Sequence, residues 1–382
     1  MATVLVLGAG IGGLVASKRL RRALPRSHRV VLVEREASFV FAPSLTWLTT
    51  GGRTERSISR PLQSLVRGGI ELLRGEIVGI DPGRRRVSVA GTELDGDYMI
   101  IALGAELAPD QVPGLAEAGC NLYTAVGAGQ MRDALARFEG GRIVVLTAAP
   151  AYKCPAAPYE TAMLIEAHVR GRGLRDRTEI ALYAAEAAPM ATAGPEVAKA
   201  VRQMVESKGI AYHPEHQVVS ADGAKRSLEF ANGATAGYDL LAFVPPHRAP
   251  KVVRDSGLAP EGGWMTVDRH TLQTAHPRVY ALGDVASIPL ASGRPLPKAG
   301  VFAHRQAEVV AHNIACEILG RGKPRSFDGL GECFIEAGGG RAGVGKGNFY
   351  AEPVPRVAVY APARRWHLAK LMIEKAWLLG WY

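Results

Sequence analysis

Turns that follow apolar strands carry the residues of this sequence best suited to chemistry. Residues 8–13 lie between an apolar run at residues 4–7 and a helical pattern, and their glycines are Gly8, Gly10, Gly12 and Gly13. Such glycines let the backbone approach a pyrophosphate at the N-terminus of the following helix, where partial positive charge attracts anions. This turn predicts a dinucleotide site.

A carboxylate lies at about the distance where such a site binds ribose. Residues 30–33 form a second apolar run, which ends at Glu34. In a dinucleotide-binding unit this acidic side chain accepts hydrogen bonds from ribose hydroxyls. NAD and FAD share the pattern, so these residues leave the choice between them open. A tight turn without a ligand is the alternative.

A second turn of this kind lacks the glycines. Residues 143–146 form another apolar strand, but residues 147–155 contain Pro150, Cys154 and Pro155 and no glycine. Two prolines and a cysteine do not leave a helix N-terminus open to a pyrophosphate. The sequence therefore predicts a flavoprotein with a thiol where an NAD(P)H site would lie.

Two later segments select FAD. Residues 98–105 and 278–286 are apolar strands that end at Gly104 and Gly283. Asp284 follows, and its carboxylate can accept hydrogen bonds from ribitol hydroxyls beyond the carboxyl edge of the sheet. Both segments resemble the additional FAD-binding segments of flavoproteins with two dinucleotide-binding domains.

Lys298 lies where a long helix begins. Residues 297–300 open this helix, which the pattern extends to about residue 319. A helix N-terminus facing the pyrimidine ring of a flavin stabilises the anionic reduced flavin, and a lysine there adds a full charge. The alternative is a solvated first-turn lysine, the commoner place for this residue type.

Composition agrees with an α/β protein. The chain has 382 residues, 47% of them hydrophobic, and 44 glycines, enough for two or three domains with many tight turns. It has no apolar run long enough to span a membrane and no leader before the first strand, which predicts a peripheral protein on the cytoplasmic side of a membrane. The net charge of +10 favours an anionic membrane surface or substrate. No basic patch interleaved with aromatics is present, which argues against nucleic acid.

The expected fold is α/β, with two Rossmann-like domains of the FAD-dependent disulfide-reductase type and a C-terminal amphipathic helical region. Strands are expected near residues 143–147 and 179–184 and a helix near 195–208. The expected parts are residues 1–112 and 237–325 for the FAD-binding domain, 113–236 for a second Rossmann-like domain without an NAD site, and 326–382 for a redox-cysteine and membrane-association region.

The cysteines favour redox chemistry over metal binding. The four, at positions 120, 154, 316 and 333, show neither zinc-site spacing nor a CxxC pair, so no metal site is expected. In a reducing compartment a disulfide is more often catalytic than structural. For Cys154 and Cys333 the alternative is a buried, inert thiol. Cys316 lies within a helical run and is expected to pack.

Two segments, residues 152–160 and 333–338, resemble the redox-cysteine segments of the sulfide:quinone oxidoreductases. The resemblance covers essentially the whole chain and extends to residues 41–44, 297–298, 312–314 and the tail at 365–375. It implies that Cys154 and Cys333 hold a disulfide or sulfur bridge on the re face of FAD, with quinone on the opposite face.

The resemblance also implies the chemistry. Hydrosulfide attacks the bridge by thiol–disulfide exchange and releases one cysteine as thiolate. We expect Cys333 to be the thiol that attacks the flavin and Cys154 to carry the persulfide, with a thiolate pKa lowered by nearby positive potential. Glu160, six residues after Cys154, can move a proton; a first-turn glutamate that complements the helix dipole is an equal alternative.

The chain departs from the family at two places. Tyr123 and Gly127 stand where many members have a third redox cysteine and a histidine, and Cys120 lies three residues early. A two-cysteine mechanism is therefore expected, and the role of Cys120, the form in which sulfur leaves and its chain length stay open. Residues 189–192 stand where a histidine has been assigned to the quinone side.

The C-terminal residues predict an amphipathic helix on a membrane surface that admits quinone. A polar stripe recurs at helical spacing: His367, Lys370, Glu374 and Lys375. Apolar residues fill the rest: Leu368, Leu371, Met372, Ile373, Trp377, Leu378 and Leu379, with Trp381 and Tyr382 at the end. Such a segment is too short and too charged to span a bilayer but suits its interface, helped by Arg364 and Arg365. The alternative is a helix packed on the body or on a twin subunit.

Rival functions come from different classes. The flavoprotein subunit of flavocytochrome c sulfide dehydrogenase donates to a cytochrome, but it attaches its flavin through a cysteine near residues 41–44, where this chain has none. A type II NADH:quinone dehydrogenase is disfavoured by the missing second glycine turn. A non-enzymatic flavin-thiol sensor would need neither quinone nor membrane. The physiological acceptor, the true sulfur donor and the oligomeric state, a homo-oligomer included, stay open.

Overall fold

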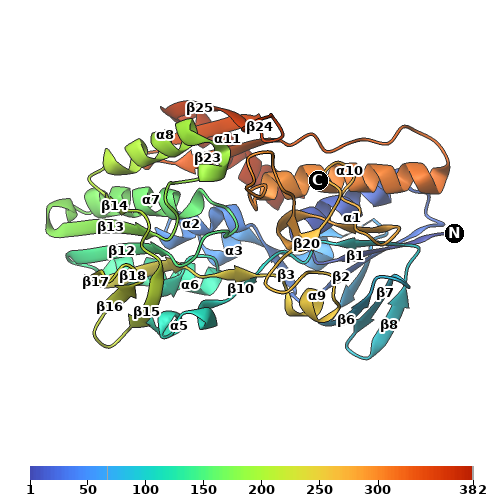
Figure 1. The fold of residues 1–382 in the computed structure, drawn as a ribbon, viewed down its shortest axis with the longest axis horizontal. Helices are drawn as coiled ribbons and strands as arrows, with labels where there is room; N and C mark the ends of the chain where they lie inside the picture. Colours follow the sequence, from blue (N-terminus) through green and yellow to red (C-terminus); the bar gives the residue numbers. More distant parts are fainter. Residues whose placement is uncertain (67, 381–382) are drawn as a thin grey trace.

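Two α/β lobes lie side by side in the computed structural model, which describes residues 1–66 and 68–380 (Figure 1). The first lobe has a five-stranded parallel sheet in the order β21-β9-β1-β2-β5. Its strands are β1 (Thr3–Leu7), β2 (Arg29–Glu34), β5 (Glu71–Arg74), β9 (Tyr98–Ile101) and β21 (Val279–Ala281). The central strands are almost continuously apolar because both faces of the sheet are covered.

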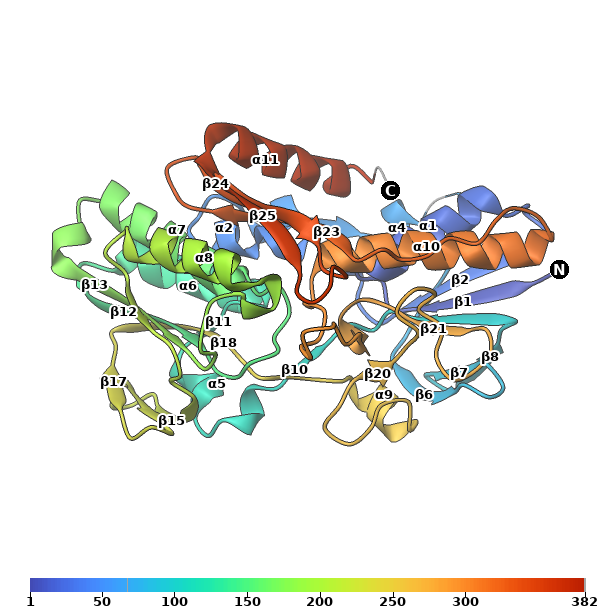
Figure 2. The same ribbon diagram turned by 45° about the horizontal axis from the view of Figure 1, so that its top comes forward.

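Two helices pack together on one face of this sheet (Figure 2). They are α1 (Ile11–Ala23), which follows the glycine turn, and α10 (Gly300–Leu319), which ends at the residue expected from sequence. The other face carries an antiparallel meander of β6 (Ile77–Asp81), β7 (Arg86–Val89) and β8 (Thr92–Asp95).

The second lobe repeats this plan with the order β11-β18-β12-β13-β14, again all parallel. Its strands are β11 (Cys120–Asn121), β12 (Gly141–Thr147), β13 (Thr178–Ala184), β14 (Ala211–His213) and β18 (Leu240–Val244). The expected return to the FAD-binding domain at residue 237 is wrong, because β18 pairs with β12 along five residues in the second sheet.

The helices of the second lobe are α6 (Ala125–Arg137), α7 (Ala157–Gly171) and α8 (Pro195–Glu206), the last close to the expected span. A second meander, β15 (Val218–Asp222), β16 (Ser227–Phe230) and β17 (Thr235–Gly237), precedes β18 as the first meander precedes β9. The aspartate directly before β9 and the aspartate directly before β18 have the same role. The Asp97 carboxylate accepts from the Thr3 N–H at 2.7 Å, and that of Asp239 accepts from the Arg142 N–H at 2.7 Å.

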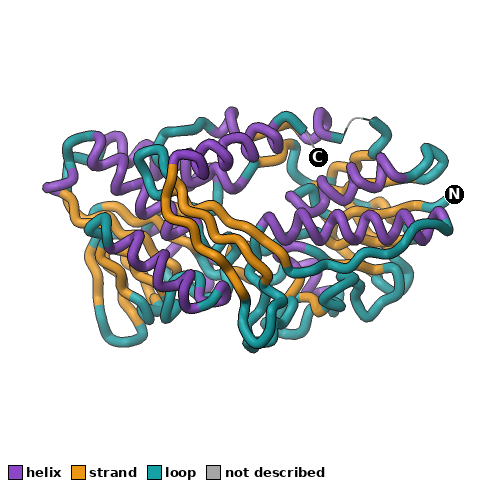
Figure 3. The backbone as a smooth tube through the Cα atoms, turned by 90° about the horizontal axis from the view of Figure 1, so that it is seen from above, coloured by secondary structure: helices purple, strands orange, loops and turns teal. Residues whose placement is uncertain are grey.

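A further sheet lies between the lobes. It is antiparallel and consists of β23 (Leu330–Glu336), β24 (Ala342–Asn348) and β25 (Arg356–Ala363), followed by α11 (Arg364–Leu378). Seen from above, it stands in front, between the two groups of parallel strands (Figure 3). It brings β23 beside α7 and lays α11 over the segment between the lobes.

The remaining elements are short connectors. They are β3 (Ser38–Val40), α2 (Leu45–Thr49), α3 (Glu55–Ile58), β4 (Ser59–Pro61), α4 (Leu62–Leu65), β10 (Glu106–Leu107), α5 (Leu115–Ala118), β19 (His247–Arg248), α9 (Lys251–Asp255), β20 (Met265–Thr266) and β22 (Ala286–Ser287). Of these, α2 and α3 matter most for the site, because they lie beneath α11.

Candidate functional site

The glycine turn after β1 combines close packing with an open position. Gly8 has φ +97°, and a Cβ there would lie 2.6 Å from the Ala102 carbonyl oxygen. A Cβ on Gly13 would lie 1.8 Å from the carbonyl oxygen of Gly8, and one on Gly12 would meet a leucine methyl at 2.3 Å. A Cβ on Gly10 would meet none of the described residues within 4 Å and lies on a cavity wall. Gly10 is therefore the glycine that leaves room for a ligand.

Glu34 lies at the end of β2, and its carboxylate is fixed beside this turn. Its Oε2 accepts from the Ala9 N–H at 2.7 Å, and its Oε1 accepts from the N–H groups of Arg35 and Glu36 at 2.8 and 3.0 Å. Backbone donors hold the side chain in place, and it lines the same cavity as Gly10. A carboxylate has further lone pairs, which can accept ribose hydroxyls.

A cavity of about 1120 Å³ connects the glycine turn with the cysteines. Gly10, Glu34 and Asp284 line it, and so do Cys154 and Cys333. Asp284 is half-buried; desolvation raises the pKa of its carboxyl, while Lys153 and Lys298 act to lower it. Gly104 and Gly283, with φ of +68° and +72°, also line the cavity. The open glycine, the fixed carboxylate and the cavity together fit FAD.

Lys298 is not the solvated lysine of the alternative interpretation. Its Nζ donates to the carbonyl oxygens of Asp284 at 2.6 Å and Ala286 at 3.1 Å and lies 3.5 Å from the centroid of the Trp264 ring. Burial lowers the pKa of the Lys298 ammonium to about 8, against the opposing effect of Asp284. The cation and the N-terminus of α10 both lie on the cavity wall, where they favour an anion.

Cys154 lies in a loop held in an unusual backbone conformation. It has φ +49° and Ala151 has φ +68°, both in the left-handed region that disfavours residues with a Cβ. The Cys154 N–H donates to the Lys298 carbonyl at 2.6 Å, and the Cys154 carbonyl accepts from the Tyr123 hydroxyl at 3.0 Å and the Ala157 N–H at 2.9 Å. These bonds offset a strain of about 1 kcal/mol or more and aim the thiol into the cavity.

Cys333 reaches the same cavity from β23, where it pairs with Gly345. Both cysteines are free thiols in this structure. Burial, with the Glu160 carboxylate, raises the pKa of Cys154 to about 11, and burial together with Cys154 raises the pKa of Cys333. The expected lowering of the thiol pKa is wrong: Lys370 acts in that direction, but desolvation outweighs it.

The other two cysteines lie elsewhere. Cys120 is in β11, opposite Ala242, and Cys316 is on α10, with its sulfur 3.4 Å from Nε2 of His312. Among the described residues that line the cavity, neither appears. Burial raises the pKa of Cys120. Tyr123, in the place of the third family cysteine, does line the cavity and contributes a hydroxyl to the Cys154 loop.

Glu160 is a buried acid paired with a lysine from the C-terminal helix. Its Oε1 accepts from the Lys370 ammonium at 2.5 Å and from the Thr46 hydroxyl at 2.6 Å. Lys370 Nζ also lies 4.7 Å from the centroid of the Trp47 ring. Burial alone lowers the pKa of Lys370, but Glu160 and Glu336 outweigh it and the pKa is raised. Glu160 is in the first turn of α7, yet it faces the cavity rather than solvent.

Glu186 was not expected from the sequence and holds the cysteine loop together. It lies two residues beyond β13, and its carboxylate accepts from the hydroxyls of Thr147 at 2.7 Å, Tyr152 at 2.5 Å and Tyr159 at 2.6 Å. Glu34 occupies the equivalent place in the first lobe. The repeated strand pattern is the signal that identifies Glu186.

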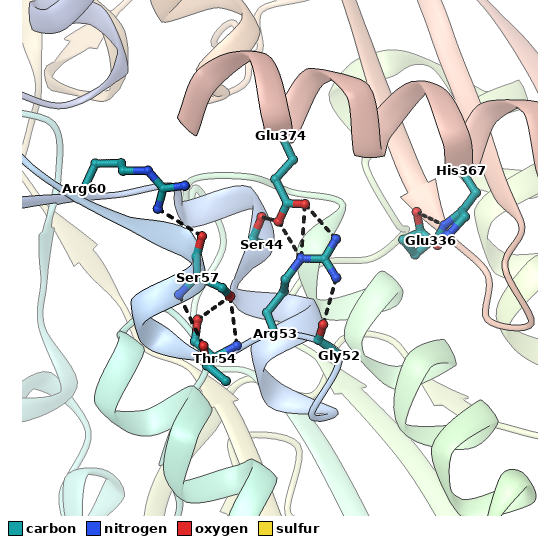
Figure 4. Close-up of polar contacts among 9 residues, drawn as sticks. All are labelled: Ser44, Gly52, Arg53, Thr54, Ser57, Arg60, Glu336, His367 and Glu374. Carbon is teal, nitrogen blue, oxygen red and sulfur yellow. Dashed lines mark hydrogen bonds and ion pairs between the residues drawn. The ribbon is translucent and has the colours of Figure 1, made fainter. Parts of the chain in front are cut away.

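The polar stripe of α11 faces the body of the protein (Figure 4). Arg53 binds the Glu374 carboxylate through Nε at 2.9 Å and Nη2 at 2.6 Å, and the Ser44 hydroxyl donates to it at 2.6 Å. Nδ1 of His367 lies 2.9 Å from Oε2 of Glu336. Lys375 alone of the four polar residues is exposed.

The outer face of α11 carries three large apolar side chains beside Lys375. Leu368, Met372 and Leu379 are 57%, 66% and 74% exposed. Trp377 and Leu378 are buried against the body, as expected for a helix packed on the protein. The helix therefore packs on the body with one face and exposes large apolar side chains on the other. Trp381 and Tyr382 lie outside the described residues. Within residues 1–66 and 68–380, none of the helices combines the length and apolar character that crossing a bilayer requires.

Comparisons with known proteins identify a family and several relatives. Residues 2–307 match the family described as pyridine nucleotide-disulphide oxidoreductase. The mitochondrial sulfide:quinone oxidoreductase of Mus musculus is 26% identical over 367 residues, covering 92% of this chain and 79% of that protein. The sulfide-quinone reductase of Aquifex aeolicus is 27% identical over 394 residues, covering 98% and 90%. The X-ray structure of the Aquifex aeolicus sulfide:quinone oxidoreductase has a TM-score of 0.88 and 24% identity, covering 99% of this chain and 91% of that one.

These matches confirm the predicted fold class, the resemblance to the sulfide:quinone oxidoreductases and FAD as the cofactor. The family match includes the glycine turn, Glu34, Cys154, Glu160 and the segment at Asp284 and Lys298. The chain belongs to the pyridine nucleotide-disulphide oxidoreductase family.

Proposed function

We propose that the protein is a sulfide:quinone oxidoreductase, which oxidises hydrosulfide at Cys154 and Cys333 and transfers the electron pair to a quinone. One observation carries this: two thiols from distant parts of the chain line the cavity that begins at the glycine turn. The relatives from Mus musculus and Aquifex aeolicus, whose names state sulfide and quinone, support the substrate pair.

The sulfur chemistry balances with two cysteines. Hydrosulfide attacks a disulfide between Cys154 and Cys333, which leaves a persulfide on one cysteine and a thiolate on the other. Joining of the persulfide to the thiolate gives a trisulfide bridge and releases one proton and two electrons. FAD, when bound, accepts this electron pair. We propose that Cys154 carries the persulfide and Cys333 faces the flavin.

Protein groups on both sides of the cavity serve this chemistry. Glu160 is the carboxylate whose charge acts most strongly on both thiols. This suits Glu160 to take the proton that hydrosulfide loses. We propose that Gly10 and Glu34 hold the pyrophosphate and ribose of the cofactor, and that Asp284 binds the ribitol. Lys298, with the N-terminus of α10, favours negative charge on the reduced flavin.

An aromatic wall suits a quinone. Phe39, Phe41 and Trp377 all line the cavity, and the Trp377 ring is stacked on each phenylalanine with ring centroids 5.9 Å apart. Ile373 and Lys370 of α11 line it too. Flat aromatic and apolar surfaces bind a quinone ring, and one charged group can orient its carbonyl oxygen.

We also propose that α11 lies on a membrane surface. Its inner stripe binds the protein through Lys370 and Glu374, which leaves Leu368, Met372 and Leu379 to enter the interface. Arg364 and Arg365 are exposed at its N-terminal end, where they can meet anionic lipid. An apolar quinone would then pass from the bilayer to the wall beneath the helix.

Two observations disfavour the rivals. Glu186, in the place where a second dinucleotide would bind, is already bound by three hydroxyls of the chain itself. Residues 41–44 contain no cysteine for a covalent flavin. The proposal is tested by turnover of purified protein with sulfide and decylubiquinone, against NADH with the same quinone. Quinol formed with sulfide and not with NADH supports it; the reverse result would replace it with an NADH dehydrogenase.

A further inference from the structure

Glu336 is a buried acid that the mechanism above does not use. Glu336 ends β23, three residues after Cys333, and its side chain is 1% exposed. Its carboxylate lies 2.9–3.0 Å from Nδ1 of His367 (Figure 4). The His367 side chain is 24% exposed, so it joins this buried acid to solvent.

The charge of Lys370, whose ammonium is hydrogen-bonded to Glu160, also acts on Glu336. The charged groups that act on Glu336 are Lys370 and His367 from α11 and Glu160 from α7. Burial has the largest effect and raises the pKa of Glu336. The carboxyl can therefore hold a proton nearer to neutral pH. Lys370 lines the cavity. The charges of Glu160, Glu336 and Cys154 each raise the pKa of its ammonium. The edge of the Trp47 ring lies against His367, with ring centroids 6.2 Å apart.

The proposed reaction needs a proton from outside. Hydrosulfide loses two electrons and one proton when its sulfur enters the bridge. A quinone takes up two electrons and two protons when it becomes quinol. One proton for each turnover must therefore come from solvent and reach the quinone side of a largely apolar cavity.

We propose that His367, Glu336 and Lys370 form the inlet for this proton, an inference that rests on the proposed function. His367 takes the proton from solvent and transfers it to Glu336. Glu336 in turn recharges Lys370 after the ammonium has given its proton to the reduced quinone oxygen. In this step the amine of Lys370, on its flexible stem, leaves Glu160 and turns to Glu336. Glu336 and His367 thus supply Lys370 without contacting the quinone themselves.

The test separates proton delivery from sulfide chemistry. Flavin-loaded protein is reduced with one equivalent of sulfide under anaerobic conditions, then mixed in a stopped-flow instrument with decylubiquinone in weakly buffered solution that contains a pH indicator. Flavin absorbance reports re-oxidation and the indicator reports proton uptake. The variants are Glu336→Gln and His367→Asn. The asparagine amide keeps a donor near the position of Nδ1 but does not titrate.

We expect both variants to reduce normally with sulfide and to show re-oxidation and proton uptake at least about tenfold slower than wild type, since proton transfer by a positioned group contributes about 10²-fold or more. Imidazole added to a His367→Ala variant should restore the rate. Glu374→Gln is the matched control, because it removes a buried charge of the same helix that is bound by Arg53 and Ser44. We expect it to re-oxidise faster than either test variant.

Each other result has a defined meaning. If the two variants take up protons at the wild-type rate, the proton enters elsewhere and the inlet is wrong. If Glu374→Gln slows proton uptake as much as Glu336→Gln, the effect is loss of helix anchoring and the inlet is again wrong. If sulfide fails to reduce the flavin even in wild type, the proposed function fails first, and the inlet with it.

Discussion

Glu34 and Glu186 follow equivalent strands of the two lobes but are bound by different donors. Glu34 accepts from three backbone N–H groups and faces a cavity, whereas Glu186 accepts from the hydroxyls of Thr147, Tyr152 and Tyr159. One carboxylate is positioned for a ligand, and the other ties down the loop that carries Cys154. The two lobes share a plan, and we expect a dinucleotide to bind in the first lobe and not in the second.

This difference predicts that NADH does not reduce the flavin. Under anaerobic conditions the purified protein should keep its oxidised flavin spectrum for minutes with millimolar NADH, because prolines and the Glu186 network occupy the second site. Sulfide at the same concentration should bleach the flavin, which is the internal control. Rapid bleaching by NADH would show that the second lobe still binds a nicotinamide.

Lys298 should be needed to retain FAD. In Lys298→Met the two carbonyl oxygens that accept from Nζ lose a charged donor, which lowers the free energy of unfolding by about 2 kcal/mol. We expect FAD to dissociate roughly tenfold more readily, equivalent to about 1.4 kcal/mol. The flavin-to-protein ratio after gel filtration measures this. Lys346→Met, an exposed lysine of the cavity rim, is the control and should keep its FAD; equal loss in both variants would contradict the role of Lys298.

The two half-buried cavity thiols should react slowly until the pH is high. With its pKa raised to about 11, Cys154 in the reduced protein is thiolate in only about one molecule in 10³ at pH 8, whereas an ordinary thiol is roughly one quarter thiolate. Alkylation by iodoacetamide, followed by peptide mass spectrometry, should therefore be about 100-fold slower in the folded protein than in guanidine. The rate should still rise between pH 8 and 10. A plateau near pH 8 would show that positive potential dominates instead.

The sign of the linked stability follows from the same pKa. A thiol whose folded-state pKa is raised contributes its stability fully below the unfolded value of about 8.5 and loses it as the pH rises toward about 11. The reduced protein should therefore melt at a lower temperature at pH 10 than at pH 8.

The outer face of α11 should control membrane binding. In the double variant Leu368→Glu and Met372→Glu, two side chains can no longer enter the interface, at a cost of about 3 kcal/mol or ~100-fold in partitioning. Flotation with anionic vesicles and turnover with a long-tailed quinone should fall together, while sulfide still bleaches the flavin. Val126→Glu, at an apolar residue of α6 that is 67% exposed, is the control. Unchanged flotation of the double variant would contradict the membrane role of this face.

Local sequence was enough to predict the first dinucleotide site. Gly10, Glu34 and Asp284 follow strands whose apolar pattern is visible in the sequence, so their place at the edge of one sheet could be predicted. The same reasoning assigned residues 240–244 to the wrong sheet, because an apolar pattern predicts a strand but not the sheet that the strand joins. The shared roles of Asp97 and Asp239 show that the second lobe repeats the first, and this repeat would have given the right assignment.

Contacts across the chain could not be predicted in this way. Lys370 and Glu160 are 210 residues apart, and their pairing depends on how α11 lies over α2 and α7. The polar stripe was visible, but its partners Arg53 and Glu336 were not. The thiol pKa shift was predicted with the wrong sign because the sequence shows nearby charges more readily than it shows burial.

The two-thiol mechanism is tested most directly by anaerobic reduction of the flavin with sulfide in single cysteine variants. Cys154→Ala and Cys333→Ala should bind FAD as wild type does but lose sulfide-driven bleaching by at least about 10³-fold, as expected for loss of a covalent nucleophile. Cys120→Ala and Cys316→Ala, which leave the cavity wall intact, should bleach at rates within about twofold of wild type. Near-normal bleaching in either of the first two variants would contradict the account.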